Sequence, residues 1–139
     1  MKTRMLILAA TAVLILVSTG CSPRNSEEEQ GGNTMNVMKI NAEEAKTMME
    51  EEEVIVVDVR TEEEYKEAHI EEAVRLTLDT IEDKATEILP DKQAKYLVYC
   101  RSGNRSATAS ELLRSMGYEN IYDFGGIVDW PYETVSGDE

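Results

Sequence analysis

One cysteine in a polar, glycine-containing segment is the residue of this sequence best placed for covalent chemistry. Cys100 begins a segment that continues with Arg101, Ser102, Gly103, Asn104, Arg105 and Ser106. The apolar residues before it are expected to form a buried strand, and residues 107–116 repeat with the spacing of a helix. Backbone N–H groups at a helix start and nearby guanidinium groups both attract anions. The arrangement therefore predicts an anion-binding loop around a nucleophilic sulfur.

The chemistry of this sulfur depends on its ionisation, because the thiolate rather than the thiol attacks. Gly103 offers no side chain that would stop the loop from curling around Sγ, and Ser106 falls in the expected first turn of the next helix. The inward-facing N–H groups would also bind an anionic substrate and stabilise its charge during transfer. A buried structural cysteine is the alternative. We favour the nucleophile because a structural cysteine would not need this loop.

The elements that must position the loop alternate between strands and helices. Runs of apolar and β-branched residues predict strands at 37–40, 54–59, 73–78, 96–100 and 121–122. Helical spacing predicts helices at 42–51, after Thr61, at 81–89 and at 107–116, the last ended by Gly117. Asn41 and Thr61 each have a glutamate three residues on, Glu44 and Glu64, which predicts a capping box at the start of the first two helices. Residues 124–126 are expected to form a turn, and residues 127–130 a terminal helical turn.

This alternation predicts a single α/β domain with a central, mainly parallel sheet and helices on both faces. In such sheets, ligands bind beyond the carboxyl ends of the strands. Asp58 and Cys100 each end an apolar strand. We therefore expect both side chains at the same edge of the sheet.

The N-terminal residues predict export. Two basic residues precede an apolar run at 5–17, which is too short for a comfortable transmembrane helix. The run leads into small residues and Cys21, similar to the lipobox of bacterial lipoproteins, although Ser18 stands where an aliphatic residue is usual. We expect 1–21 to be a lipoprotein-type signal peptide. A lipid on Cys21 would hold the protein at a bacterial membrane on its extracytoplasmic side. An ordinary cleaved signal with an incidental cysteine is the alternative.

The remainder is expected to form one domain. Residues 22–34 are rich in Ser, Glu, Gly and Asn and predict a flexible tether. Residues 35–135 have the length of one domain with one core, and 136–139 are expected to be a disordered tail. We expect the protein to be a monomer.

The net charge and the number of cysteines restrict the possible binding partners and disulfides. The net charge of −14 argues against nucleic acid or an anionic membrane surface as a partner, and it makes the two arginines of the Cys100 loop conspicuous. The sequence holds two cysteines. If Cys21 carries lipid, Cys100 is the only thiol and no intramolecular disulfide forms. A disulfide between the two is the less favoured alternative.

Several motifs in collinear order resemble the rhodanese family. The segment from Cys100 is similar to the family's Cys-Arg-x-Gly-x-Arg-Ser loop. Other matching motifs are Asp58-Val59-Arg60, Glu63-Glu64-Tyr65, His69-Ile70, Gly117-Tyr118, Gly125-Gly126 and Trp130. Departures are confined to one turn, where Ala68 stands for Gly and Glu71-Glu72 for Pro-Gly. The resemblance spans about 37–132 and implies a rhodanese-like fold.

The resemblance also implies sulfane-sulfur transfer. Cys100 would take sulfur from a small donor such as thiosulfate or a persulfide, hold it as a persulfide, and pass it to a thiol or cyanide. No metal or organic cofactor is needed. The loop residues would bind the transferred sulfur, with Asp58 and Arg60 in support. Arg105 would either brace the loop by pairing with Asp58, which we favour, or touch the donor, a role better suited to Arg101. The family's histidine at the position of His69 implies a structural turn residue rather than a general base.

Two other functions stay open. A Cys-dependent phosphatase or arsenate reductase-like enzyme is the first alternative. Protein tyrosine phosphatases and the related cell-cycle phosphatases also use a cysteine, an amide-lined loop and an arginine, but with five residues between the cysteine and the arginine. Here four residues separate Cys100 from Arg105. The shorter loop favours a single sulfur atom over a tetrahedral oxyanion. A non-catalytic, tethered binding module is the second alternative, which we disfavour because the loop is complete.

Overall fold

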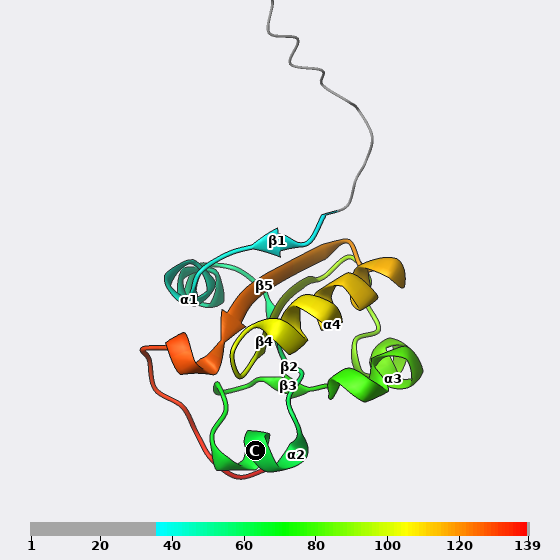
Figure 1. Ribbon diagram of the computed structural model, residues 1–139. Coiled ribbons are helices and arrows are strands. Elements are labelled where there is room, and N and C mark those ends of the chain that lie inside the picture. The colour runs from blue at the N-terminus through cyan, green and yellow to red at the C-terminus, as the bar shows by residue number, and fades with distance from the viewer. Residues whose placement is uncertain (1–35, 139) are drawn as a thin grey trace, which may run out of the picture. The chain divides into compact units, whose positions relative to one another are not determined.

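The computed structural model describes residues 36–138 and contains a five-stranded parallel sheet in the order β1-β5-β4-β2-β3 (Figure 1). The strands are β1 (Met38–Lys39), β2 (Ile55–Asp58), β3 (Val74–Arg75), β4 (Lys95–Cys100) and β5 (Asn120–Gly126). The two longest, β4 and β5, lie side by side near the middle, with short strands at both edges. The expected α/β architecture with a parallel sheet is confirmed.

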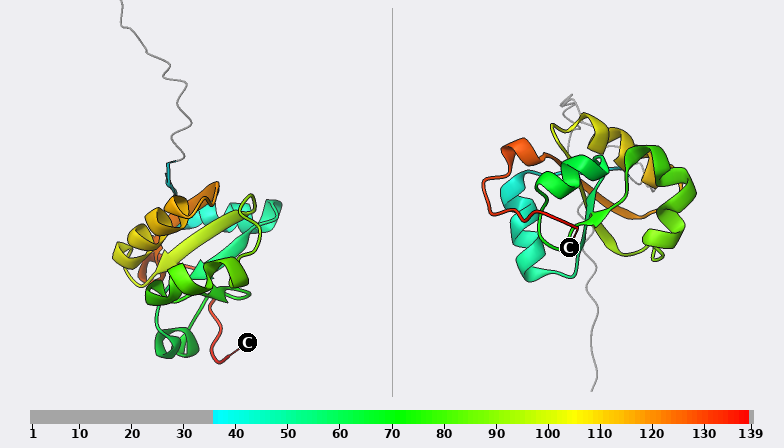
Figure 2. Two further views of the ribbon diagram at one scale, coloured as in Figure 1. Left: turned by 90° about the vertical axis from the view of Figure 1, so that its right-hand side faces the viewer. Right: turned by 90° about the horizontal axis from the view of Figure 1, so that it is seen from below.

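Helices cover both faces of the sheet (Figure 2). They are α1 (Ala42–Glu51), α2 (Glu62–Glu67), α3 (Ile81–Ile88) and α4 (Asn104–Ser115), with short 3₁₀ turns η1 (Leu78–Thr80) and η2 (Ile127–Asp129). Two hydrophobic clusters follow from this layering. In β4, Val98 and Cys100 pack with residues of α3 and α4, whereas Leu97 and Tyr99 pack with residues of α1 and α2. Successive strand residues point to opposite faces, so Cys100 belongs to the α4 side.

Local sequence signals explain where α1 and α2 begin. Asn41 and Thr61 each accept a hydrogen bond from the backbone N–H three residues on, and the glutamate at that position bonds back to the cap. Both capping boxes are confirmed. Gly117 follows α4 with a φ of +93°, a left-handed conformation that glycine adopts without strain.

Three expectations about local structure were wrong. The strand expected at 73–78 is reduced to β3, because the chain bends into η1 soon after Leu76 N–H bonds to Asp58 O. Residues 124–126 belong to β5 rather than to a turn; a register shift beside Val98 and Tyr99 accommodates Gly125 at φ +88°. The helix expected at 107–116 already begins at Asn104, directly behind the cysteine loop.

The last described residues also differ from the expected disordered tail. Gly137 donates its N–H to Lys66 O at 2.9 Å, and Asp138 forms an ion pair with Lys66 Nζ at 3.2 Å. Residues 136–138 therefore contact the end of α2. The expected signal peptide and tether, including Cys21, lie outside the described residues. Within 36–138, no helix is long and apolar enough to span a membrane.

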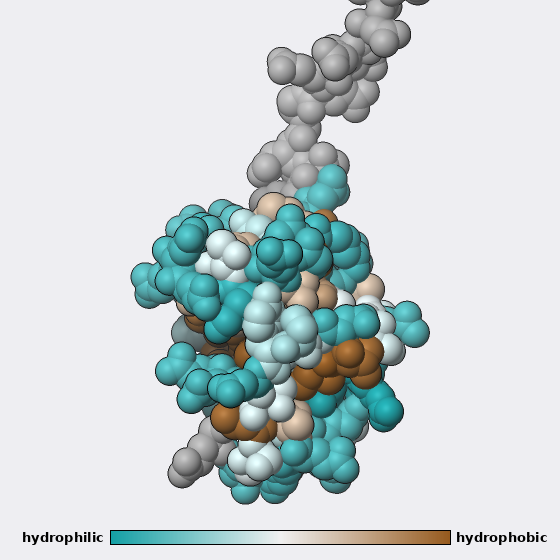
Figure 3. All heavy atoms as spheres, turned by 90° about the vertical axis from the view of Figure 1, so that its left-hand side faces the viewer, coloured by the Kyte–Doolittle hydropathy of each residue, from teal (hydrophilic) through white to brown (hydrophobic). Residues whose placement is uncertain are grey.

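The face of the domain drawn in Figure 3 is mostly hydrophilic, with smaller hydrophobic areas. Three large apolar side chains are exposed among residues 36–138: Met38, Val128 and Tyr132. A groove of about 950 Å³ lies between α1, the start of β2 and residues 130–133. None of its lining residues belongs to the 100–106 loop.

Candidate active site

The Cys100 loop connects the carboxyl end of β4 to the first turn of α4. Gly103 adopts a φ of +99°, which turns its N–H towards the sulfur, 3.0 Å from Cys100 Sγ. Cys100 is 1% exposed, whereas the side chains of Arg101, Ser102 and Asn104 lie on the surface. The sulfur thus lies inside a loop whose outer side chains face solvent.

Two opposing effects act on the thiol of Cys100. Burial alone would raise its pKa, because it disfavours the charged thiolate. Hydrogen bonding by the backbone N–H groups of Ser106, Gly103 and Ser102 outweighs burial and holds the pKa of Cys100 below its ordinary value. The loop therefore favours the nucleophilic form of the sulfur.

A buried carboxylate supports this loop from β5. The hydroxyl of Ser106 lies 2.7 Å from Asp123 Oδ1, 3.0 Å from Gly103 O and 3.2 Å from Gly125 O. It has one proton, and the charged and nearest acceptor is Asp123. Asp123 also accepts the Gly125 N–H at 3.0 Å and pairs with Lys39 Nζ. The sequence analysis missed Asp123; its only signal was a charged residue inside an otherwise apolar strand.

Close packing of β5 against the loop depends on Gly126. A Cβ atom at this position would lie 2.3 Å from Arg101 O and 2.6 Å from Ser102 Cα, closer than real contacts allow. Val128 then donates its N–H to Arg101 O at 3.2 Å. Gly126, the second glycine of the pair that resembles the family motif, therefore lets the backbone of β5 reach the cradle formed by residues 100–106.

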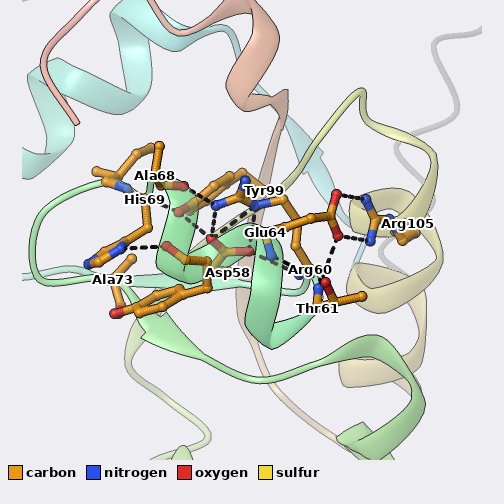
Figure 4. Close-up of polar contacts among 11 residues, drawn as sticks. Asp58, Arg60, Thr61, Glu64, Ala68, His69, Ala73, Tyr99 and Arg105 are labelled. Atoms are coloured by element: carbon orange, nitrogen blue, oxygen red, sulfur yellow. Dashed lines mark hydrogen bonds and ion pairs between the residues drawn. The ribbon is translucent and has the colours of Figure 1, made fainter. Parts of the chain in front are cut away.

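Arg105 braces the loop, but with a partner different from the expected one. Its guanidinium donates to both carboxylate oxygens of Glu64 in α2, at 2.6 and 2.7 Å (Figure 4). The expected pairing with Asp58 is wrong, because the Asp58 carboxylate is already occupied by Arg60. The Arg105 hydrogen bonds, opposed by partial burial and aided by the Thr61 N–H, lower the pKa of Glu64 to about 2.

Asp58 and Arg60 form a buried ion pair beside the site (Figure 4). Asp58 accepts hydrogen bonds from Arg60 Nη2 at 2.6 Å and from the Tyr99 hydroxyl at 2.6 Å. Arg60 also donates to Ala68 O at 2.7 Å. Burial and then the Asp58 charge raise the pKa of Tyr99, so this hydroxyl stays a donor. The network joins β2, β4 and the end of α2.

His69 lies in the turn after α2. Its Nδ1 is 2.9 Å from Tyr65 O, its ring stacks on Tyr65 with centroids 3.7 Å apart, and its backbone pairs with Val135. These contacts tie the C-terminal segment to α2. They fit a structural turn residue.

The site can therefore bind an anion and present a thiolate, without a group for metal chemistry among the described residues. Within 36–138, no three His, Cys, Asp or Glu side chains lie close enough to hold a metal ion. The donors around Sγ are backbone N–H groups. Such groups can stabilise negative charge on the sulfur or on an atom attached to it.

Comparison with known proteins places this geometry in a family. The sequence model of the rhodanese-like domain family matches residues 41–132 of this chain. The thiosulfate sulfurtransferase PspE of Escherichia coli (strain K12) is 33% identical over 81 residues, which cover 58% of this chain and 78% of that protein. A tRNA uridine(34) hydroxylase of Erwinia tasmaniensis is 35% identical over 120 residues, covering 83% of this chain but only 33% of that protein.

Solved structures of rhodanese-like domains have a similar fold. A rhodanese-like domain protein from Staphylococcus aureus matches with a TM-score of 0.64 and 31% identity, covering 73% of this chain and 100% of that one. Fold, sequence and the cysteine loop therefore agree, and the chain belongs to the rhodanese-like domain family.

Proposed function

We propose that this protein is a sulfurtransferase that carries a sulfane sulfur on Cys100. The observation that supports the proposal most is the loop geometry: a sulfur with a lowered pKa lies 3.0 Å from the Gly103 N–H, at the start of α4. Membership of a family that includes a thiosulfate sulfurtransferase agrees with it.

The proposed reaction has two steps. The Cys100 thiolate attacks the outer sulfur of a donor such as thiosulfate; the donor's S–S bond breaks, and sulfite leaves with the bonding electron pair. Cys100 then carries a persulfide anion in the same loop. A thiolate or cyanide acceptor attacks the terminal sulfur, and the Cys100 thiolate leaves. Charge and electrons balance, so neither step needs an external oxidant.

The test is direct detection of the intermediate. The full chain carrying Cys21→Ser, in which Cys100 is the only thiol, is incubated with thiosulfate and examined by intact mass spectrometry. We expect the addition of one sulfur atom that disappears after cyanide treatment, and no addition when Cys100→Ser is combined with it. Absence of the adduct on Cys100 would refute the proposal and favour a non-catalytic binding role.

The alternative function that must be tested is hydrolysis of phosphate esters by Cys100. The loop surrounds one sulfur atom with the N–H groups of Ser102, Gly103 and Ser106, and Arg105 is held by Glu64 rather than directed at an oxyanion. We expect no Cys100-dependent hydrolysis of an aryl phosphate. Hydrolysis that Cys100→Ser abolishes would contradict the sulfurtransferase proposal.

We also propose that a lipid on Cys21 anchors the domain on the outer side of a bacterial membrane. The support is the sequence: a basic start, a short apolar run and small residues before the cysteine. When the full chain is expressed in a bacterium, we expect a lipid-modified mass in the membrane fraction. Cys21→Ser should move the protein to the soluble extracytoplasmic fraction. An unmodified cytoplasmic protein would contradict the proposal.

A further inference from the structure

The loop contains two arginines, but their charges are not equally available to a substrate. Both terminal nitrogens of Arg105 are used by Glu64, in a two-point ion pair at 2.6 and 2.7 Å. The side chains of Arg105 and Glu64 are 34% and 23% exposed, so water only partly screens the pair. Arg101, by contrast, is exposed on the surface.

Arg105 is nevertheless close enough to influence the sulfur. It lies in the same loop, and the negative charge of ionised Cys100 helps to raise the pKa of Arg105, after the larger effect of Glu64 and against partial burial. An Arg105 without Glu64 would therefore add positive charge beside Cys100. With Glu64 in place, the pair contributes almost no net charge there.

We infer that Glu64 sets the donor preference of Cys100: by neutralising Arg105 it disfavours a doubly charged donor such as thiosulfate and favours a singly charged alkyl persulfide. This inference rests on the sulfurtransferase function proposed above. Glu64 acts through Arg105, so it is a positioning residue that determines specificity rather than a catalytic residue.

The physical reason is the difference in donor charge. Thiosulfate carries two negative charges and an alkyl persulfide anion carries one. In both cases the Cys100 thiolate attacks the outer sulfur, the donor's S–S bond breaks, and either sulfite or an alkyl thiolate leaves. In general, two unit charges about 6 Å apart at an effective dielectric constant of about 40 interact strongly enough to change an affinity about tenfold. Releasing Arg105 should therefore help thiosulfate more than the persulfide.

Glu64→Gln is the variant that isolates this charge. Glutamine can keep the capping box, in which the side chain at this position accepts the Thr61 N–H, so α2 should still form. It can keep one hydrogen bond to Arg105 but cannot neutralise it. Glu63→Gln is the matched control: it removes the same charge from an exposed neighbour in the same helix. All variants carry Cys21→Ser.

The experiment measures the rate constant for loading sulfur onto Cys100, by rapid quench and intact mass, with thiosulfate and with 2-hydroxyethyl persulfide. We expect the unmodified site to prefer the persulfide. Glu64→Gln should raise the thiosulfate-to-persulfide ratio about tenfold, with a steeper loss of the thiosulfate rate as salt is added. Glu63→Gln should leave the ratio unchanged. The gain should vanish in Glu64→Gln/Arg105→Gln.

Each other outcome counts against a distinct statement. Loading from both donors with an unchanged ratio in Glu64→Gln, or equal slowing of both, overturns the inference and leaves Glu64 a structural brace. A ratio gain that persists without Arg105 also overturns it. Loading from neither donor in the unmodified site overturns the proposed function, and the donor inference with it.

Discussion

A methyl group at Gly126 should damage the cradle more than it damages the fold. Gly126 has ordinary extended dihedral angles, φ −123° and ψ 146°, so alanine would suffer no backbone strain there. The added Cβ would lie 2.3 Å from Arg101 O, whereas such contacts are rarely shorter than 3.0 Å. Either β5 or the cysteine loop must therefore move by roughly 1 Å, a shift large enough to misalign a reacting group.

Two magnitudes follow for Gly126→Ala. Forcing an extra methyl group into packed structure costs about 1–3 kcal/mol of unfolding free energy. A displacement of about 1 Å of the groups around a nucleophile lowers a rate by about a hundredfold. We expect this larger effect in the rate of loading sulfur from thiosulfate onto Cys100, because the atoms that would clash belong to Arg101 and Ser102 of the loop.

The control is Gly117→Ala, a substitution that lowers stability at a glycine that does not contact the loop. Gly117 has a φ of +93°, and its added Cβ would meet only the Lys92 side chain, at 3.8 Å. Gly117→Ala should lose about 1–2 kcal/mol through backbone strain and keep its loading rate. Urea unfolding and rapid-quench loading are measured on both variants. If Gly126→Ala loads sulfur at the rate of Gly117→Ala, the close approach of β5 does not shape the cradle.

Three further predictions concern charge. Alkylation of Cys100 by iodoacetamide in Cys21→Ser should rise to its plateau with a midpoint below the ordinary cysteine pKa, since hydrogen bonds from Ser106, Gly103 and Ser102 overcome burial. Ser106→Ala should move that midpoint upwards, because Asp123 would no longer hold the start of α4 and its N–H groups around Sγ; an unchanged midpoint would mean that this hydrogen bond does not position those donors. Asp58→Asn should lower the free energy of unfolding by about 3–5 kcal/mol, because it leaves the buried Arg60 without its counter-ion; urea denaturation showing less than 1 kcal/mol would mean that water reaches this pair. The stability that Glu64 contributes should depend on pH, because the Arg105 hydrogen bonds lower its pKa in the folded protein to about 2. The contribution is complete above the unfolded pKa of about 4.5 and is lost as the pH falls towards 2. The stability gap between the unmodified chain and Glu64→Gln should therefore shrink from pH 6 to pH 3, and a constant gap would contradict the low pKa.

The parts of the fold that the sequence predicts well are those determined by neighbours in the chain. The caps at Asn41 and Thr61 lie three residues from the glutamates that complete them, and both formed as expected. The β-branched run of β2 and the helical spacing of α4 are also local signals. The position of Cys100 at a strand end follows directly from them.

The missed features are tertiary. Arg105 and Glu64 are 41 residues apart, and Ser106 and Asp123 are 17 apart, so no local pattern links either pair. Asp58 was the obvious acid near Arg105 by strand position, but the tight turn after β2 brings Arg60 back onto it first. Residue type predicts a turn at 124–126, whereas the structure uses Gly126 to let β5 pass close to the loop.

The loop is therefore held from two independent sides, and this explains how a flexible, glycine-containing segment can be preorganised. From α2, Glu64 holds Arg105; from β5, Asp123 holds Ser106, and Gly126 leaves room for the Arg101 backbone. In the proposed cycle the negative charge moves by one bond, from Sγ of the thiolate to the terminal sulfur of the persulfide. A rigid set of N–H donors around that bond can stabilise both states without reorganising. Loosening the β5 side should therefore slow both steps, whereas Glu64→Gln, which can keep one hydrogen bond to Arg105, should alter the choice of donor.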